Sequence, residues 1–162
     1  MSLVIVKPNE YLIAADRRIL QGYCYRDDIA KVSHLSDGYY CAVVGNAVLE
    51  TMTKIWWQEA DYEQDPEMLA LSLGGFLGTR SGQDVQGTVV LGIPLAGGGA
   101  SFWEIDHDGT VLPILVDRAV GAPSEAAQVL LKTGASLSTI FALVASSNAS
   151  ISSCFDEFYV GV

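Results

Sequence analysis

Short runs rich in apolar, β-branched and aromatic residues dominate the first 44 residues, and such runs between turn signals are typical of β-strands. Turn-forming segments such as Pro8-Asn9-Glu10 and Ser36-Asp37-Gly38 separate the runs. Five strands are therefore predicted, over residues 3–7, 11–15, 22–25, 29–35 and 39–44.

The apolar spacing changes to that of a helix after Gly45, which is predicted to end the fifth strand. Asn46 is the expected N-cap of a helix over residues 47–60, and Asp65 caps a second helix that ends near Gly78. The rest of the chain is predicted to form strands 87–95, 102–106, 110–116 and 151–160, a helix that opens at 121–125 and runs to 133, and a helix over 137–145 capped by Ser136.

The predicted order is strands, two helices, strands, two helices and a final strand. No linker or internal repeat divides it, so residues 1–162 are expected to form one domain. Two stacked sheets between two helix layers would bury the apolar faces of all these elements. We therefore expect an α+β chain folded as a four-layer αββα sandwich.

The net charge of −10, from 19 acidic and 9 basic residues, makes the surface acidic. Such a surface repels phosphate backbones and anionic lipids, so nucleic acids and membranes are disfavoured as partners. No stretch approaches the ~20 apolar residues of a membrane-spanning helix. No signal peptide is expected, since Lys7-Pro8-Asn9-Glu10 interrupts the first apolar run. These features predict a cytoplasmic protein.

Cys24, Cys41 and Cys154 are widely spaced and contain no C-x-x-C pair, so we expect reduced thiols in the core. A zinc site built from these cysteines with His34 and His107 is disfavoured, because the spacing fits no known ligand cluster.

Gly97-Gly98-Gly99 precedes a predicted strand, whereas a phosphate-binding loop precedes a helix. The run is therefore interpreted as a hairpin turn. A small-molecule binding module has little support, and no cofactor is predicted.

Five segments resemble motifs of proteasome β-subunits and follow one another in the same order as in that family. They are residues 11–18, which contain Ala-Ala-Asp-Arg-Arg, and residues 30–32, 42–45, 102–109 and 119–135. The chain is thus similar to N-terminal-nucleophile (Ntn) hydrolases, and it resembles most the short proteasome-like proteins of bacteria and phages and the peptidase subunit of the bacterial two-component protease. The resemblance implies the four-layer Ntn-hydrolase sandwich.

The resemblance also implies a catalytic site. In this family the first residue of the mature chain is the nucleophile and its own α-amine is the base. Ser2 matches that position once Met1 is removed. Lys31 matches the lysine beside the nucleophile, Asp16 its carboxylate partner, and Gly45 the glycine whose N–H helps to bind the oxyanion.

Each of these residues also has a simpler interpretation. Ser2 is then an ordinary terminal residue or a cloning remnant, and Gly45 only a glycine required at a strand-to-helix turn. Asp16 and Lys31 would form an ion pair that holds the fold in active and inactive members alike. Arg18 is expected to orient the neighbouring loop.

Two departures from the family pattern favour a catalytically degenerate subunit with a structural or regulatory role in a phage or bacterial assembly. The family's Gly-Ser-Gly is Gly121-Ala122-Pro123 here, which lacks the serine hydroxyl. The loop after the fourth helix, Ser146-Ser147-Asn148-Ala149-Ser150, lacks the family's aspartate. Asparagine or serine side chains in this loop would replace hydrogen bonds but not the charge.

The resemblance implies self-association into a dimer or ring, with a peptide substrate and an unfoldase as further partners. If a phage encodes the chain, the protein is expected in the cytoplasm of the host cell. Trp56-Trp57 supports self-association, because adjacent helical positions diverge by about 100° and one of the two is expected to point outward.

Overall fold

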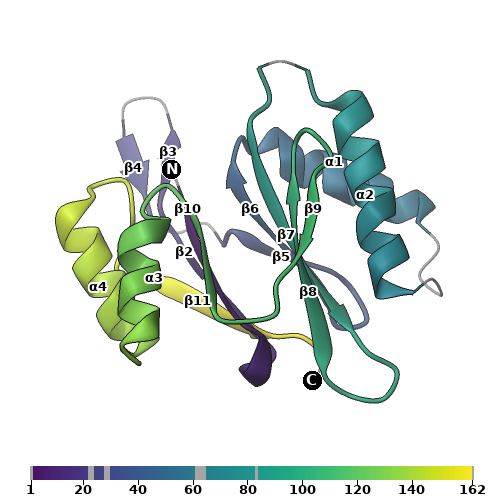
Figure 1. Ribbon diagram of the computed structural model, residues 1–162. Coiled ribbons are helices and arrows are strands. Elements are labelled where there is room, and N and C mark those ends of the chain that lie inside the picture. The colour runs from purple at the N-terminus through teal and green to yellow at the C-terminus, as the bar shows by residue number, and fades with distance from the viewer. Residues whose placement is uncertain (1, 22–23, 28–29, 61–64, 83, 162) are drawn as a thin grey trace.

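The computed structural model describes residues 2–21, 24–27, 30–60, 65–82 and 84–161, and of residues 19–21 and 24–26 it describes the backbone alone. The chain is a mixed α+β protein with two larger antiparallel sheets and four α-helices (Figure 1).

The first sheet has the strand order β10-β1-β2-β11. Its strands are β1 (Leu3–Lys7), β2 (Leu12–Asp16), β10 (Arg118–Gly121) and β11 (Phe155–Tyr159). Strands β1 and β2 form a hairpin in which Val4 lies opposite Ala15. The chain turns between them through a short 3-10 helix (Pro8–Glu10).

The second sheet has the order β5-β6-β7-β8-β9, in which consecutive strands of the chain are neighbours. Its strands are β5 (Val32–Ser36), β6 (Tyr39–Gly45), β7 (Gly87–Pro94), β8 (Ala100–Asp106) and β9 (Val111–Pro113). Asp37 and Gly38 make the β5–β6 turn with φ of 42° and 84°, as the sequence predicts. Residues 97–99 lie in the β7–β8 turn, which confirms their interpretation as a hairpin.

Asp65 and Ser136 cap two helices as predicted, whereas the N-cap of the first helix is Ala47 and not the predicted Asn46. The described residues form four α-helices. They are α1 (Val48–Glu59), α2 (Pro66–Arg80), α3 (Ser124–Lys132) and α4 (Leu137–Ser147). Asp65 accepts a hydrogen bond from the Glu67 N–H at 2.9 Å, and Ser136 accepts one from the Thr139 N–H at 3.3 Å. Helix α2 ends two residues beyond the predicted Gly78.

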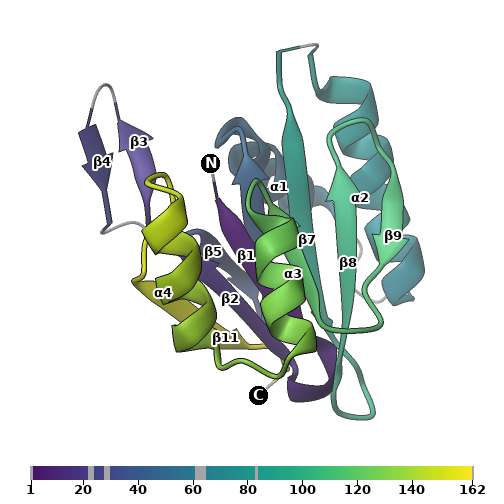
Figure 2. The same ribbon diagram turned by 60° about the vertical axis from the view of Figure 1, so that its left-hand side comes forward.

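Side-chain alternation along the strands divides the core into three clusters. Val43 faces α1 and α2, whereas its neighbour Val44 faces the first sheet. In the first sheet Val4 faces the second sheet, whereas Leu3 faces α3 and α4. The two sheets therefore pack on each other, and each carries a helix pair on its outer face (Figures 1 and 2).

Five strand predictions needed correction. Strand β5 begins at Val32, three residues later than predicted, and β9 ends at Pro113, three residues earlier than predicted. Strand β10 was not predicted, because its four residues, Arg-Ala-Val-Gly, are too few to form a recognisable apolar or β-branched run. Residues 22–25 were predicted as one strand, but β3 (Ile19–Gln21) and β4 (Cys24–Arg26) pair as a small hairpin, and residues 22–23 lie outside the described part. The last strand begins at Phe155, four residues later than predicted.

The prediction that one tryptophan of α1 points outward was wrong. Trp56 and Trp57 are only 4% and 6% exposed. The indole N–H of Trp56 donates to Ser72 of α2 at 3.2 Å, and the Trp57 ring packs on Tyr39 of β6 with 4.8 Å between centroids. Because α1 packs against both the second sheet and its neighbour α2, two of its faces are covered.

The cysteines follow the prediction in part. Cys41 is buried on β6, and burial raises the pKa of its thiol to about 12. Cys154 is exposed, contrary to the prediction, because it lies in the bend before β11, where its N–H binds the Ser152 hydroxyl at 3.0 Å. The Cys24 side chain lies outside the described part.

Within the described ranges, none of the helices is both long enough and apolar enough to cross a bilayer.

Candidate functional site

The Asp16 carboxylate, at the end of β2, is fully buried and accepts hydrogen bonds from four groups. Lys31 Nζ lies 2.9 Å from one carboxylate oxygen and 2.8 Å from the other. The Leu3 N–H donates at 2.8 Å, the Arg18 N–H at 3.0 Å and the Ser152 N–H at 3.4 Å. Several donors to one carboxylate make its ionised form compatible with complete burial. The predicted Asp16–Lys31 pair is thus present.

Lys31 precedes β5 and has a side chain only 6% exposed. Burial lowers the pKa of this ammonium, and the hydrogen bond and charge of Asp16 oppose that effect. Lys31 Nζ and the Leu3 N–H contact the same oxygen of Asp16. The carboxylate therefore connects the lysine directly to the backbone next to Ser2.

Arg18 joins the start of this site to the segment after α4. Its guanidinium binds the Asp27 carboxylate through two contacts of 2.7 Å, and the hydrogen bonds from Arg18 are the main reason that the Asp27 pKa is lowered. The same guanidinium donates to the carbonyls of Ala149 and Ile151 at 2.8 Å and 3.2 Å. The expected role of Arg18 in orienting a loop is therefore supported by direct contacts.

Ser2 immediately precedes β1 and is 7% exposed. Strand alternation places it on the same face as Val4 and Val6, which point towards the second sheet. Ser2 lines a cavity of about 420 Å³ between the sheets, together with Gly45. The other lining residues are Val44, Gln86, Gly87, Thr88, Asp106, His107, Gly121 and Ala122.

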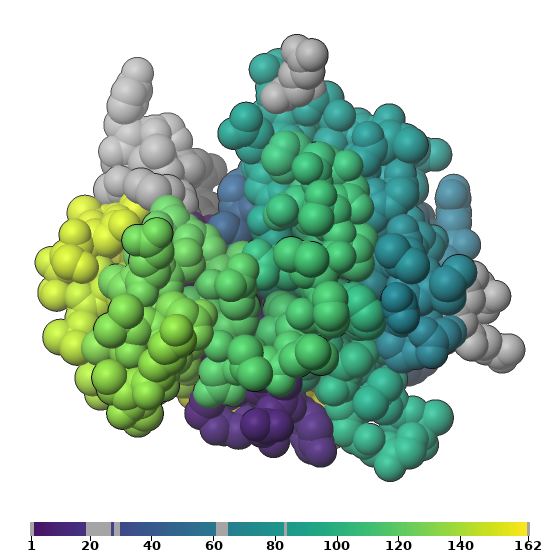
Figure 3. Space-filling model, in the orientation of Figure 1, coloured from purple at the N-terminus to yellow at the C-terminus, as the bar shows by residue number. Residues whose placement is uncertain are grey.

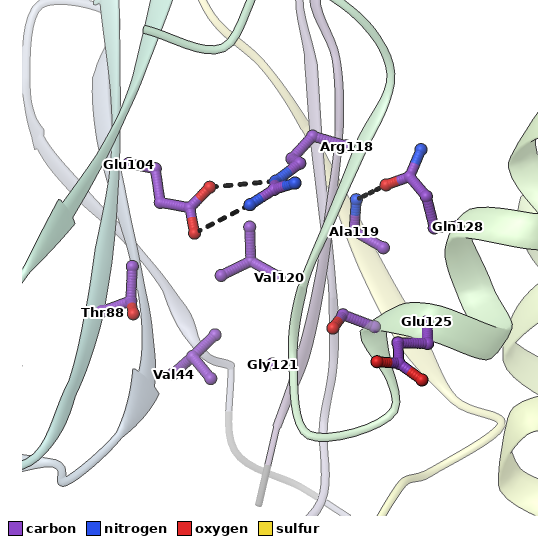
Figure 4. A pocket seen from close by; sticks show the side chains of 10 residues that line it. Val44, Thr88, Glu104, Arg118, Ala119, Val120, Gly121, Glu125 and Gln128 are labelled. Atoms are coloured by element: carbon purple, nitrogen blue, oxygen red, sulfur yellow. Dashed lines mark hydrogen bonds and ion pairs between the residues drawn. The ribbon is translucent and has the colours of Figure 1, made fainter. Parts of the chain in front are cut away.

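A second cavity, of about 390 Å³, adjoins the first and shares Val44, Thr88 and Gly121 with it. We call the two together the inter-sheet cleft. Figure 3 shows the surface hollowed between the side that carries α3 and the side that carries β7 and α2. Figure 4 shows the second cavity, with Glu104 on one wall and Glu125 on the other.

Two glycines let the backbone approach closely around Ser2. Gly121 has φ of 119°, and a Cβ there would lie 2.0 Å from the Ser2 carbonyl oxygen. Gly45 has φ of 105°, and a Cβ there would lie 2.6 Å from the Gln86 carbonyl oxygen. Neither position tolerates a side chain without displacement of the backbone that lines the cleft.

The direction of the Gly45 N–H follows from the pairing of β6. The Val43 N–H donates to the Lys31 carbonyl, on the side of β5, and the Asn46 N–H donates to Gln86, on the side of β7. Because N–H groups alternate sides along a strand, the Gly45 N–H points towards the β5 side, past Lys31. It is thus directed towards the end of the sheet where the lysine lies.

The structure therefore places all four predicted residues around the start of β1: Ser2 and Gly45 line one cavity, and Asp16 and Lys31 meet behind the Leu3 amide. Sequence reasoning missed the Ser152 N–H as a ligand of Asp16. Of the substitutes considered in the loop after α4, Asn148 instead accepts hydrogen bonds from the backbone and side chain of Ser150. Contacts of this kind leave no signal in the residue types.

Residues 2–21, 24–27, 30–60, 65–82 and 84–161 include no group of three His, Cys, Asp or Glu side chains that could hold a metal ion.

No protein-family model matches the chain, and no curated protein sequence is significantly similar to it.

Proposed function

We propose that the chain adopts the four-layer αββα sandwich of Ntn hydrolases and acts as an N-terminal serine peptidase or amidase. The observation that carries the proposal is that the Asp16 carboxylate contacts both Lys31 Nζ and the amide that follows Ser2, while Ser2 lines a cavity with Gly45. A hydroxyl residue, a buried lysine–carboxylate pair and a glycine N–H are the groups that such a reaction requires.

The reaction begins with removal of Met1, which gives Ser2 a free α-amine. Ser2 Oγ attacks the carbonyl carbon of an amide, and its proton passes to this amine, a base with a pKa of ~7.7–8.0. The Gly45 N–H donates to the oxyanion, a contact worth ~10²–10³ in rate. When the tetrahedral intermediate collapses, the C–N bond breaks, and the leaving amine takes the proton from the Ser2 ammonium.

A water molecule then attacks the ester carbon and gives a proton to the α-amine. The ester bond breaks, Ser2 Oγ recovers that proton, and the acid product leaves. Lys31 stabilises the negative charge that develops on Ser2 and on the oxyanion through its field. The hydrogen bond and charge of Asp16 oppose the lowering of the Lys31 pKa by burial and so favour the ammonium form.

A degenerate, non-catalytic subunit with a structural or regulatory role is the second candidate. It is favoured by the loop after α4, which offers Asp16 and Arg18 only backbone groups and no carboxylate. It is also favoured by Ala122, which lines the cavity at the position of the family's serine. In this case Asp16 and Lys31 serve the fold alone.

The deciding experiment combines intact-mass measurement of the native N-terminus with labelling by an electrophilic N-terminal-nucleophile probe and turnover of fluorogenic peptides. Loss of Met1, one adduct on Ser2, and turnover that Ser2→Ala abolishes are expected. Ser146→Ala removes an exposed hydroxyl on α4 and is the matched control. A native chain that retains Met1 and takes no adduct would establish the second candidate.

We also propose that the protein works as a homo-oligomer, a dimer or a ring, in the cytoplasm. The outer surface of α1 and α2 supports this, because it exposes large apolar side chains to 45–56% of their area: Val48, Ile55, Met68 and Leu71. A ring would confine peptide substrates, with an unfoldase as a further partner. Light scattering after size exclusion should give a mass above 17.3 kDa, and Ile55→Glu should reduce it.

A further inference from the structure

The second cavity of the inter-sheet cleft contains an ion pair that spans the two sheets. Glu104 lies on β8 and Arg118 on β10, and Arg118 Nε is 3.0 Å and Nη2 3.4 Å from the Glu104 carboxylate oxygens (Figure 4). The Glu104 side chain is 15% exposed and that of Arg118 is 48% exposed. The guanidinium charge is thus already matched by one carboxylate.

A second carboxylate faces this cavity. Glu125, in the first turn of α3, lies on the side opposite Glu104 (Figure 4). The amide of Gln128 is occupied, since it accepts from the Ala119 N–H at 2.9 Å and donates to the Asp117 carbonyl at 2.8 Å. The described residues that line the cavity include two carboxylates and one guanidinium, so their formal charges sum to one negative charge.

This cavity continues directly into the cavity of Ser2. Gly121 lines both and packs against the Ser2 carbonyl. Thr88 also lines both, and its hydroxyl donates to Asp106 at 2.6 Å, which adds a further carboxylate to the wall near Ser2. A peptide whose scissile amide lies at Ser2 would therefore have the cavity of Glu104 and Glu125 next to its cleaved bond.

We propose that the second cavity is a subsite that takes the Lys or Arg side chain of a peptide substrate, beside the amide that is cleaved. The proposal rests on the proposed function for the identity of the cleaved bond. A cavity of about 390 Å³ is within the range of specific ligand sites. The aliphatic stem would lie on Val44 and Val120, and the cationic tip would lie between the carboxylates. An acidic side chain would meet uncompensated negative charge.

The test uses three fluorescein-labelled tetrapeptides, Ala-Lys-Ala-Ala, Ala-Glu-Ala-Ala and Ala-Leu-Ala-Ala. Their binding to Ser2→Ala protein is measured by anisotropy, and their turnover is measured with the native protein. The lysine peptide should bind and react best. Glu125→Gln should reduce the advantage of the lysine peptide over the glutamate peptide about 1.4- to fivefold, the range expected of an exposed charge pair. Glu104→Gln with Glu125→Gln leaves Arg118 unmatched and should reverse the preference.

Glu157→Gln is the matched control, because Glu157 is exposed on β11, at the opposite edge of the first sheet from β10. Suppose that turnover requires Ser2, but the ratio of turnover of the lysine peptide to that of the glutamate peptide is the same in Glu125→Gln and Glu157→Gln. The subsite is then refuted and the proposed function stands. If turnover does not require Ser2 but binding shows the charge preference and its reversal, the subsite stands alone. Equal binding of all three peptides overturns it.

Discussion

Replacement of Lys31 by Met would remove the only side-chain cation that the described hydrogen bonds bring to Asp16, while it retains most of the apolar stem. The carboxylate would remain fully buried with its three backbone donors, from Leu3, Arg18 and Ser152. Breaking a buried ion pair at one partner destabilises a protein by about 3–5 kcal/mol. We expect Lys31→Met to lower the free energy of unfolding by about that amount.

The reciprocal change is Asp16→Asn. It leaves the Lys31 ammonium buried without a counter-charge and turns an amide N–H₂ towards backbone donors. An effect of about 3–5 kcal/mol is again expected. If the two effects added, the loss would approach the 5–15 kcal/mol that stabilises a typical domain. Because both changes act on one interaction, the double variant should instead recover about 1–3 kcal/mol of the sum.

Equilibrium urea unfolding, followed by the fluorescence of the buried Trp56 and Trp57, measures all four proteins of this cycle. Lys54→Met is the control, because the Lys54 side chain is 51% exposed and pairs with Glu50 on the surface of α1. It should change the stability by less than about 0.5 kcal/mol. The reasoning would be refuted if the double variant lost the sum of the two single losses of unfolding free energy to within about 0.5 kcal/mol. It would also be refuted if Lys31→Met lost no more unfolding free energy than Lys54→Met.

Three further predictions concern single positions. Gly121→Ala should lower the unfolding free energy by about 2 kcal/mol or more. Gly134 also has a positive φ, of 76°, but open space around it, so Gly134→Ala should cost only about 1 kcal/mol in the same assay. Cys41, with its pKa of about 12, should react with a disulfide reagent at pH 8 only after unfolding, as peptide mapping would show. Burial opposes ionisation of Glu50, but hydrogen bonds, chiefly from Lys54, outweigh it and lower the pKa of Glu50. The native protein therefore loses stability as the pH falls below about 4.3, the pKa of an unperturbed Glu. Glu50→Gln should remove part of that loss in an acid titration of the unfolding free energy.

Local signals explain which parts of the fold the sequence could predict. Asp65 and Ser136 cap helices because their side chains reach N–H groups two or three residues away, so the sequence alone contains both partners. The burial of Trp56 depends on Ser72 and the rest of α2, which pack beside α1 on the same sheet. No periodicity within α1 contains that information.

In the candidate site, too, some residues could be predicted from the sequence and others depend on contacts between distant elements. Asp16, Lys31 and Gly45 were found through motifs that resemble those of a family, and the structure brings the first two into contact. Strand β10 was missed because it is four residues long and its position is set by pairing with β1. Its pairing places Gly121 opposite Leu3, and without it neither cavity of the inter-sheet cleft has a second wall.

The contacts of Asp16 and Arg18 with the segment after α4 have a consequence for the order of assembly during synthesis. The Ser152 N–H is 136 residues from Asp16 in the chain, and the Ala149 carbonyl is 131 residues from Arg18. Contacts of such long sequence separation form late in folding. The hydrogen bonds around the carboxylate therefore cannot be complete until residues 149–152 have left the ribosome, and a nascent chain remains without a finished site until the segment after α4 is made.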